Sequence, residues 1–171
     1  MELQQAQTED AAAIMEVIEE ARAFLKAAGS IQWQRQYPAL SDIEADIAKR
    51  QGYILDVDGA VAGYAAVITG EEPAYTAITD GNWSNGSLDY VTIHRLAMSD
   101  KFRGQGLTHE LFERIFEMMN ARGYYDFRID THEHNAIMRH IFEREGFVKR
   151  GIVQIEGERW AYQREDVALS D

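Results

Sequence analysis

Apolar residues recur along the chain at two spacings, one of three to four residues that is typical of a buried helix face and one of two residues that is typical of a strand. A first helix is predicted from Thr8, which could cap it, to near Gly29. A second is predicted from Ser41 to Gly52, because residues 41–44 have the spacing of a capping box.

Two further helical patterns begin at residues that favour helix starts. One follows Gly106 and ends near Gly123, with leucine, isoleucine and methionine recurring on one face. The other begins at Asn135 and is closed by Gly146.

Alternating apolar residues predict the strands. The strands over residues 53–57 and 61–68 flank Asp58-Gly59, a strong signal for a hairpin turn. Residues 71–87, rich in Gly, Asn and Thr, indicate a long surface loop. The remaining strands are expected at residues 3–6, 88–98, 125–130, 147–155 and 159–163.

In the strand predicted over residues 88–98, the alternation of apolar and polar residues changes phase. Val91 and Ile93 are apolar at odd positions, whereas Leu96 and Met98 are apolar at even ones. Because strand side chains alternate with a period of two, this shift at residues 94–95 indicates a β-bulge or a strand buried on both faces. The bulge is the preferred interpretation.

Together these elements predict an α/β (α+β) fold in a single domain over residues 1–171. A central mixed, mostly antiparallel sheet would carry helices on both faces. The length allows one domain with a sizeable core.

The composition excludes some kinds of site and some classes of ligand. The chain has no cysteine, which excludes disulfides and cysteine-ligated metals. Its net charge of −12 argues against nucleic-acid binding and suits a cationic substrate such as an amine. The sequence starts without a basic, apolar leader and has no stretch long enough to span a membrane, so a cytoplasmic location is expected.

The segment from Met98 to Thr108 is the strongest candidate for binding. A strand ends, a charged turn carries Gly104 and Gly106, and a helix begins at once. Glycines there let a ligand approach the backbone, and the free N–H groups of a helix start can hold an anion. Since the turn lacks the Gly-Lys-Ser/Thr ending of a P-loop, a nucleotide-phosphate protein is a weaker interpretation.

These residues resemble the GNAT superfamily of acetyl-CoA-dependent N-acetyltransferases over nearly the whole chain. Its acyl-CoA signature, Gln or Arg, two residues, Gly, one residue, then Gly or Ala, fits residues 101–106, although Lys101 departs from it. A second segment, from Asn135 to Phe147, looks like the family's Asn helix with its Gly-Phe ending. The resemblance implies a sheet whose fourth and fifth strands splay apart to admit acetyl-CoA.

The resemblance also implies the residues that hold the cofactor. The turn would hold the pyrophosphate, the preceding strand would pair with the pantetheine arm, and Asn135 would hold that arm from the other side. A helix N-cap is the alternative role for Asn135, and both roles could coexist. The cofactor-binding residues expected on this basis are Leu96, Ala97, Met98, Arg103, Gly104, Gln105, Gly106, Leu107, Thr108 and Asn135.

The implied reaction is direct attack of a primary amine on the thioester in a ternary complex. Many family members carry a tyrosine as proton donor at the position of Phe142, and a phenyl ring cannot take that role. Water, another side chain, or loss of activity could each account for the change. His94 and His132 are candidate bases because imidazole titrates near neutral pH, and no metal is expected.

The acceptor is expected to contact aromatic residues. In the family the loop between the first two helices grips it, and here that loop carries Trp33 and Tyr37. Trp83, in the long loop, is a third candidate. A catalytically silent acyl-CoA-binding or regulatory module is the alternative function, and an edge strand near the C-terminus is compatible with a homodimer.

Overall fold

A computed structural model describes residues 1–168 of the chain. Two 3-10 turns, η1 (Thr8–Asp10) and η2 (Asp100–Phe102), precede α1 and α4 respectively. In chain order the helices and strands are β1 (Glu2–Gln5), α1 (Ala11–Ala27), α2 (Leu40–Ala48), β2 (Gly52–Val57), β3 (Ala60–Thr69), α3 (Pro73–Thr76), β4 (Val91–Met98), α4 (Leu107–Ala121), β5 (Asp126–Thr131), α5 (Ala136–Arg144), β6 (Val148–Gln154) and β7 (Glu158–Glu165).

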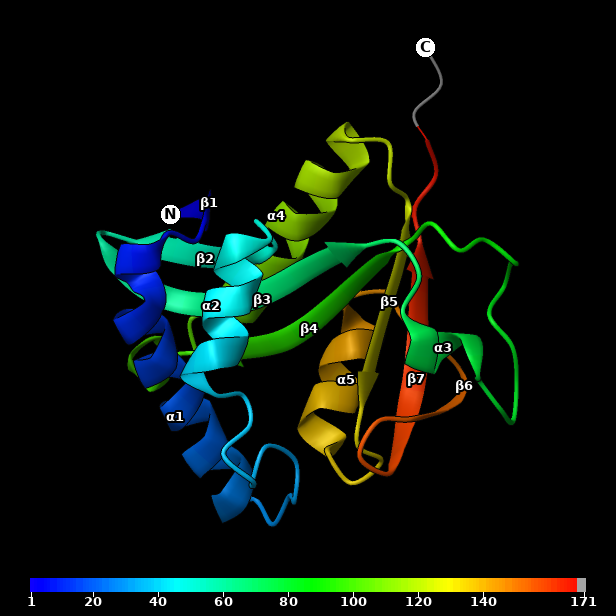
Figure 1. Cartoon of the computed structure of the whole chain (residues 1–171), viewed down its shortest axis with the longest axis horizontal. Coiled ribbons are helices and arrows are strands. Elements are labelled where there is room, and N and C mark those ends of the chain that lie inside the picture. The colour runs from blue at the N-terminus through cyan, green and yellow to red at the C-terminus, as the bar shows by residue number, and fades with distance from the viewer. Residues whose placement is uncertain (169–171) are drawn as a thin grey trace. The chain divides into compact units, whose positions relative to one another are not determined.

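The seven strands form one mixed sheet in the order β1-β2-β3-β4-β5-β7-β6 (Figure 1). β4 and β5 run parallel, whereas the pairs β1–β2, β2–β3, β5–β7 and β6–β7 are antiparallel. The predicted α/β class and mostly antiparallel sheet are therefore confirmed. β4 and β5 pair at Val91–Phe127 and Thr92–Arg128, a short ladder of the kind expected where two strands diverge.

The chain divides into two compact units. The first comprises residues 1–67 and 94–115, and the second comprises residues 68–93 and those from 116 onward. The single domain over residues 1–171 stays a prediction. No helix within residues 1–168 has both the length and the apolar character needed to cross a membrane.

In the first unit, β1, β2 and β3 form an antiparallel meander. Asp58 (φ 52°) and Gly59 (φ 85°) both adopt the left-handed conformation that the two-residue turn between β2 and β3 requires. The predicted hairpin is confirmed.

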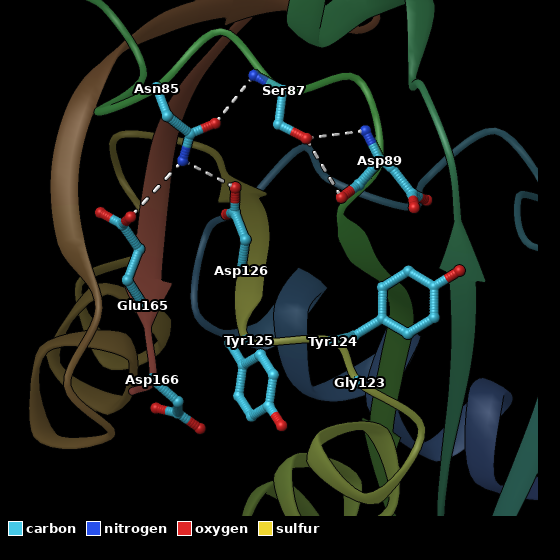
Figure 2. Close-up of a pocket in the computed structure, with 9 residues that line it drawn as sticks. All are labelled: Asn85, Ser87, Asp89, Gly123, Tyr124, Tyr125, Asp126, Glu165 and Asp166. Atoms are coloured by element: carbon cyan, nitrogen blue, oxygen red, sulfur yellow. Dashed lines mark hydrogen bonds between the residues drawn. The ribbon is translucent and has the colours of Figure 1, made fainter. Parts of the chain in front are cut away.

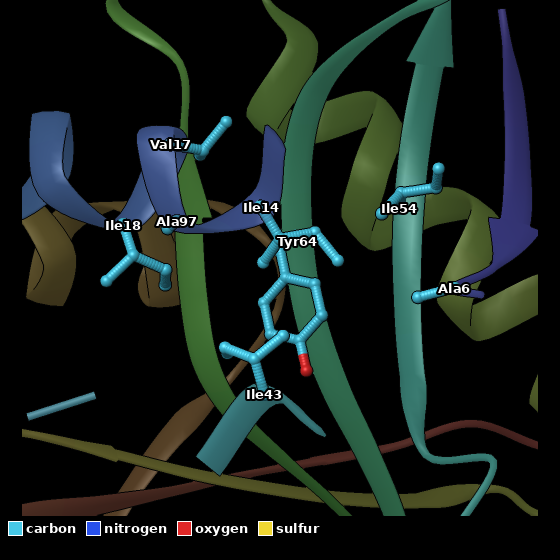
Figure 3. Packing of buried hydrophobic residues seen from close by; sticks show 8 residues of the cluster. All are labelled: Ala6, Ile14, Val17, Ile18, Ile43, Ile54, Tyr64 and Ala97. Atoms are coloured by element: carbon cyan, nitrogen blue, oxygen red, sulfur yellow. The ribbon is translucent and has the colours of Figure 1, made fainter. Parts of the chain in front are cut away.

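The core of the first unit lies between its helices and strands. α1 and α2 lie side by side over β2 and β3, and their apolar faces meet these strands (Figures 1 and 3). Each isoleucine buried there contributes roughly 1.5–3 kcal/mol. The cluster consists of Ala6, Ile14, Val17, Ile18, Ile43, Ile54, Tyr64 and Ala97.

The two predicted helix caps in this unit are wrong. The N–H of Gln7 donates to the Asp10 carboxylate at 2.7 Å, so Thr8 lies in η1 rather than capping α1. The N–H of Ala39 likewise donates to Asp42 at 2.7 Å, which places Ser41 inside the first turn of α2. In both cases an ionised carboxylate three residues on provides the stronger, charge-assisted hydrogen bond.

In the second unit, β7 lies between β5 and β6. On one face of these strands, α5 packs through Phe142, whose ring lies 5.3 Å from that of Tyr162 on β7. On the opposite face, the hydroxyl of Tyr75 in α3 donates to Asp130 on β5 at 2.6 Å. Both faces of this part of the sheet are thus covered.

The segment predicted as a surface loop is partly ordered by the sheet. It contains α3, and Thr79 exchanges two backbone hydrogen bonds with Ile152 of β6, of 2.9 and 2.8 Å. β4 begins at Val91 rather than at Leu88, a residue that is 57% exposed. Tertiary pairing with a distant strand has no local signal in the sequence, which explains the difference.

Because this segment packs against β6, substitution of Gly81 is expected to destabilise the fold. Gly81 has φ +148°, and a Cβ there would lie 1.9 Å from the carbonyl oxygen of Arg150. Gly81→Ala should therefore lower the free energy of unfolding by about 3 kcal/mol, from backbone strain and overpacking. Urea denaturation measures the loss. Gly86→Ala is the control, because a Cβ at Gly86 meets nothing within 4 Å; equal losses in the two variants would contradict the docked loop.

Candidate functional site

The turn after β4 presents backbone donors at an uncrowded surface. Gly104 (φ 78°) and Gly106 (φ 71°) are left-handed, and a Cβ at either would meet no atom within 4 Å. α4 begins at Leu107, and the first N–H groups of a helix have no partner within it. An anion can approach these groups closely, which fits a phosphate-bearing cofactor.

α1 supports this turn from one side. The N–H of Asp100 donates to Glu20 of α1 at 2.9 Å. Arg103 pairs with Asp100, and its guanidinium lies 4.0 Å from the centre of the Phe24 ring. Of the predicted cofactor residues, 103–106 therefore belong to a turn supported by α1, and Leu107 and Thr108 are the first two residues of α4.

β4 is distorted before it reaches the turn. Arg95 has φ 54°, an unusual conformation for a residue with a side chain, which costs on the order of 1 kcal/mol or more. This irregularity lies at the predicted phase change and supports the bulge. Beyond it Ala97 is buried, whereas Leu96 and Met98 are partly exposed.

The Arg95 side chain ends in a buried ion pair with Asp46 of α2. Its Nε and Nη2 atoms donate to the two carboxylate oxygens of Asp46 at 2.8 and 2.5 Å. The hydroxyl of Tyr64 on β3 donates to the same carboxylate at 2.5 Å. The Asp46 side chain is only 4% exposed, so its charge is compensated almost entirely within the protein.

The groups around Asp46 keep one charge state at neutral pH. Burial lowers the pKa of Arg95, but its hydrogen bonds to Asp46 and the attraction of that charge more than offset this and raise the pKa. Burial and the hydrogen bond to Asp46 raise the pKa of Tyr64. Arg95 is therefore a cation and the phenol of Tyr64 is neutral at neutral pH.

The loop between α1 and α2 is held by two arginines. Arg22 of α1 donates to the carbonyl oxygens of Trp33 at 3.0 Å and Pro38 at 2.6 Å. Arg95 donates from Nη1 to the hydroxyl of Tyr37 at 2.9 Å. Two of the predicted acceptor residues, Trp33 and Tyr37, thus lie in a loop that hydrogen bonds connect to α1 and β4, and Trp33 also packs on the first unit's core cluster.

Two residues of the Asn-helix motif take structural positions in the second unit. The side chain of Asn135 accepts a hydrogen bond from the N–H of Met138 at 3.1 Å, so it is the N-cap of α5. Phe142 is 1% exposed and packs against the rings of Phe147 and Tyr162. The cap does not exclude the predicted cofactor contact of Asn135, which stays a prediction.

The two candidate bases lie in different units. His94 is a partly buried residue of β4, next to Arg95. The Nδ1 of His132 accepts the N–H of His134 at 3.2 Å, so the neutral ring carries its proton on Nε2 and its basic nitrogen is occupied. Burial, with the neighbouring His134 and Arg159, lowers the pKa of His132 and favours this neutral form. The roles of His94 and His132 as bases both stay predictions.

Trp83 packs inside the second unit. Its indole N–H donates to the carbonyl oxygen of Tyr75 at 2.8 Å, and the Arg128 guanidinium lies 4.6 Å from its ring. Arg128 also stacks on Tyr90 at 3.8 Å. These contacts explain an aromatic residue in a polar loop without a ligand, and an acceptor contact of Trp83 stays a prediction.

A pocket of about 270 Å³ also lies in the second unit (Figure 2). It is lined by Asn85, Ser87, Asp89, Gly123, Tyr124, Tyr125, Asp126, Glu165 and Asp166. Three of its four carboxylates pair with arginines: Asp126 with Arg128 (3.0 Å), Glu165 with Arg150 (3.6 Å) and Asp166 with Arg164 (2.7 Å). The Asn85 amide joins two of these carboxylates. Because the negative charge is compensated, the turn after β4 is the stronger candidate site.

Sequence reasoning missed Asp46 and the role of Arg95. The signal for Asp46 was available, because it lies three residues after Ile43, on the apolar face of its helix. A carboxylate on a buried face requires a partner, but the sequence does not indicate which one.

Comparison with known proteins identifies relatives that match most of the chain. Residues 14–147 match the sequence model of the Acetyltransferase (GNAT) family. The crystal structure of a GNAT-family acetyltransferase from Streptococcus agalactiae 2603 is 39% identical, covers 97% of this chain and 95% of its own, and has a TM-score of 0.91. No curated protein sequence matches the chain.

More distant structures share the fold. A GNAT-family acetyltransferase from Listeria monocytogenes 4b F2365 has a TM-score of 0.77 at 21% identity, with coverage of 96% of this chain and 94% of that one. The PaiA N-acetyltransferase of Thermoplasma acidophilum, solved in complex with coenzyme A, has a TM-score of 0.73 at 14% identity, with coverage of 96% and 98%.

The paired charges of the second unit predict a pH-dependent stability. Burial raises the pKa of Asp126, but hydrogen bonds from Arg128, Gln163 and Asn85 outweigh it and lower the pKa below the usual 3.8. The ionised group therefore stabilises the fold above the unfolded-state pKa, and this contribution is lost as pH falls through the lower, folded-state pKa.

Asp126→Asn should thus lower the free energy of unfolding by about 3 kcal/mol at pH 7, because Arg128 is 2% exposed and would lose its carboxylate. Urea denaturation from pH 7 to pH 3 measures the difference, which should shrink toward the acid end. Asp89→Asn, an exposed carboxylate in the same pocket, is the control. A difference that grows as pH falls would refute the assignment.

Proposed function

This chain belongs to the GNAT acetyltransferase family, and we propose that it moves an acetyl group from acetyl-CoA to a primary amine of a small molecule or peptide. The amine attacks the thioester directly in a ternary complex. The observation that carries the proposal is the open, left-handed turn at Gly104 and Gly106 directly before α4. A net charge of −12 favours a cationic acceptor.

The backbone from Arg103 to Thr108 would hold the pyrophosphate. Its fit rests on the open space at both glycines and on the N–H groups of the first turn of α4, which have no hydrogen-bond acceptor within the helix itself. Leu96, Ala97 and Met98 would pair with the pantetheine amides as an added strand does. Asn135 is proposed to contact the cofactor while it caps α5.

The protein's own groups have three tasks in the transfer. Acetyl-CoA supplies an activated acetyl carbonyl with a thiolate leaving group. β4 orients the reacting groups and offers backbone N–H groups to the oxyanion. His94 takes up the amine proton, and His132 does so only in a conformation that releases its Nδ1. Water protonates the departing thiolate, because Phe142 has no proton to give.

Phe142 also supports the second candidate function, a silent acyl-CoA-binding module. Its phenyl ring is buried against two other aromatic rings, so the position of the family's tyrosine acid carries no hydroxyl. A thiolate leaves without a strong acid, and for this reason catalysis remains the favoured proposal.

Steady release of free CoA thiol tests the proposal directly. The wild-type protein should release CoA from acetyl-CoA in the presence of n-butylamine, 1,4-diaminobutane or L-leucinamide, with formation of the acetylated amine. A thiol reagent and mass spectrometry follow the two products. Tight binding of acetyl-CoA without turnover of any amine would favour the silent module. No binding at all would refute both.

The cofactor turn can be tested apart from catalysis. Gly104→Glu or Gly106→Glu should reduce acetyl-CoA affinity at least about 100-fold, because the added carboxylate fills the space proposed for the pyrophosphate and repels its charge. Isothermal titration calorimetry measures the affinity. Gly59→Glu is the matched control, since Gly59 is also left-handed and open but lies in the β2–β3 hairpin. Retained affinity in both turn variants would contradict the proposed site.

A further inference from the structure

The Asp46 carboxylate joins three segments of the first unit that are far apart in sequence. It lies on α2, binds Arg95 of β4 through both oxygens, and accepts the Tyr64 hydroxyl of β3. Its side chain is 4% exposed and that of Arg95 is 14% exposed. Since every Asp46 oxygen has a donor, the ion pair has one preferred geometry.

This geometry fixes the backbone of β4 at its distortion. Arg95 is left-handed at φ 54°, which an arginine does not adopt without compensation. The two hydrogen bonds to Asp46 hold its guanidinium toward α2. A relaxed, extended residue 95 would point its side chain elsewhere and lose the ion pair.

The same guanidinium reaches the loop between α1 and α2, residues 28–39. Its Nη1 donates to the Tyr37 hydroxyl at 2.9 Å. Arg22 holds the loop's backbone at Trp33 and Pro38, but it extends from α1 and does not touch β4 in the hydrogen bonds described for residues 1–168. Arg95 therefore ties this loop to the distorted strand.

We propose that Asp46 and Arg95 form a clamp that holds the loop of residues 28–39 in register with β4, and that Arg95 and Tyr37 are positioning residues for the amine acceptor. The inference rests on the proposed acetyl transfer, which needs the acceptor beside the thioester. Errors of about 1 Å in such alignment cost a large factor in rate.

A stability role alone does not account for this arrangement. Buried ion pairs are often no more stabilising than apolar residues of similar volume, because both charges lose their hydration. What an ion pair with two further hydrogen bonds adds is a single allowed arrangement of the connected segments. Here the connected segments are the predicted acceptor loop and the predicted cofactor strand.

Two tyrosines provide a matched test. Tyr37→Phe and Tyr64→Phe each remove one hydroxyl from the same cluster and leave the Asp46–Arg95 pair in place. Only Tyr37→Phe breaks the link to the loop. Tyr64 lies on β3, and its hydroxyl binds Asp46 and not the loop of residues 28–39. Arg95→Lys keeps the positive charge but loses the planar fork that reaches Asp46 and Tyr37 together.

Hydrogen exchange tests the clamp on the loop, and steady-state kinetics test the positioning of the acceptor. Tyr37→Phe and Arg95→Lys should speed amide exchange in residues 28–39, whereas Tyr64→Phe should not. Tyr37→Phe should also raise KM for the fastest of n-butylamine, 1,4-diaminobutane and L-leucinamide roughly two- to tenfold, the worth of one hydrogen bond, without changing the Kd for acetyl-CoA. Tyr64→Phe should leave both constants unchanged.

Any other result contradicts either the clamp, the positioning role or the proposed acetyl transfer. If loop exchange stays at the wild-type rate in Tyr37→Phe and Arg95→Lys, or rises equally in Tyr64→Phe, the clamp does not exist. Faster loop exchange with unchanged KM for the amine refutes the positioning role. If the wild type acetylates none of the three amines, the proposed function fails for them, and the exchange rates alone decide whether the clamp exists.

Discussion

The ion pair between Asp46 and Arg95 is the interaction on which the geometry of the first unit depends. It compensates a carboxylate that is almost fully buried and holds a strand residue in a left-handed conformation. The hydroxyls of Tyr37 and Tyr64 bind to the two charged groups, so a loop, a helix and two strands share one polar centre. Apolar packing of α1 and α2 surrounds this centre but does not specify its arrangement.

Much of the fold could be predicted from the sequence because the deciding signals are local. Apolar periodicity located the helices and strands, and Asp58-Gly59 located the hairpin. The phase change before Leu96 located the distortion that the structure places at Arg95. The helix caps were predicted wrongly at Thr8 and Ser41. The residues that accept the backbone N–H groups there are Asp10 and Asp42, each three residues after the donor.

The remaining features depend on contacts between distant residues, which no single segment encodes. Asp46, Arg95, Tyr37 and Tyr64 come from four elements, and only the apolar neighbours of Asp46 hinted that it is buried. The partners of Trp83, Arg128 and Tyr75, could likewise not be predicted from its polar loop, and its acceptor contact stays a prediction. The turn at Gly104 and Gly106 could be predicted from the sequence, because its left-handed conformation depends on the two glycines themselves.

The central claim is that the turn from Arg103 to Thr108 binds the pyrophosphate of acetyl-CoA while the Asp46–Arg95 pair holds β4 in its distorted form. A crystal structure of the protein with acetyl-CoA tests both parts at once. The account predicts pyrophosphate oxygens within hydrogen-bond distance of the backbone N–H groups of this turn, with Arg95 still left-handed and bound to Asp46. A cofactor bound elsewhere, or a relaxed Arg95 released from Asp46, would contradict it.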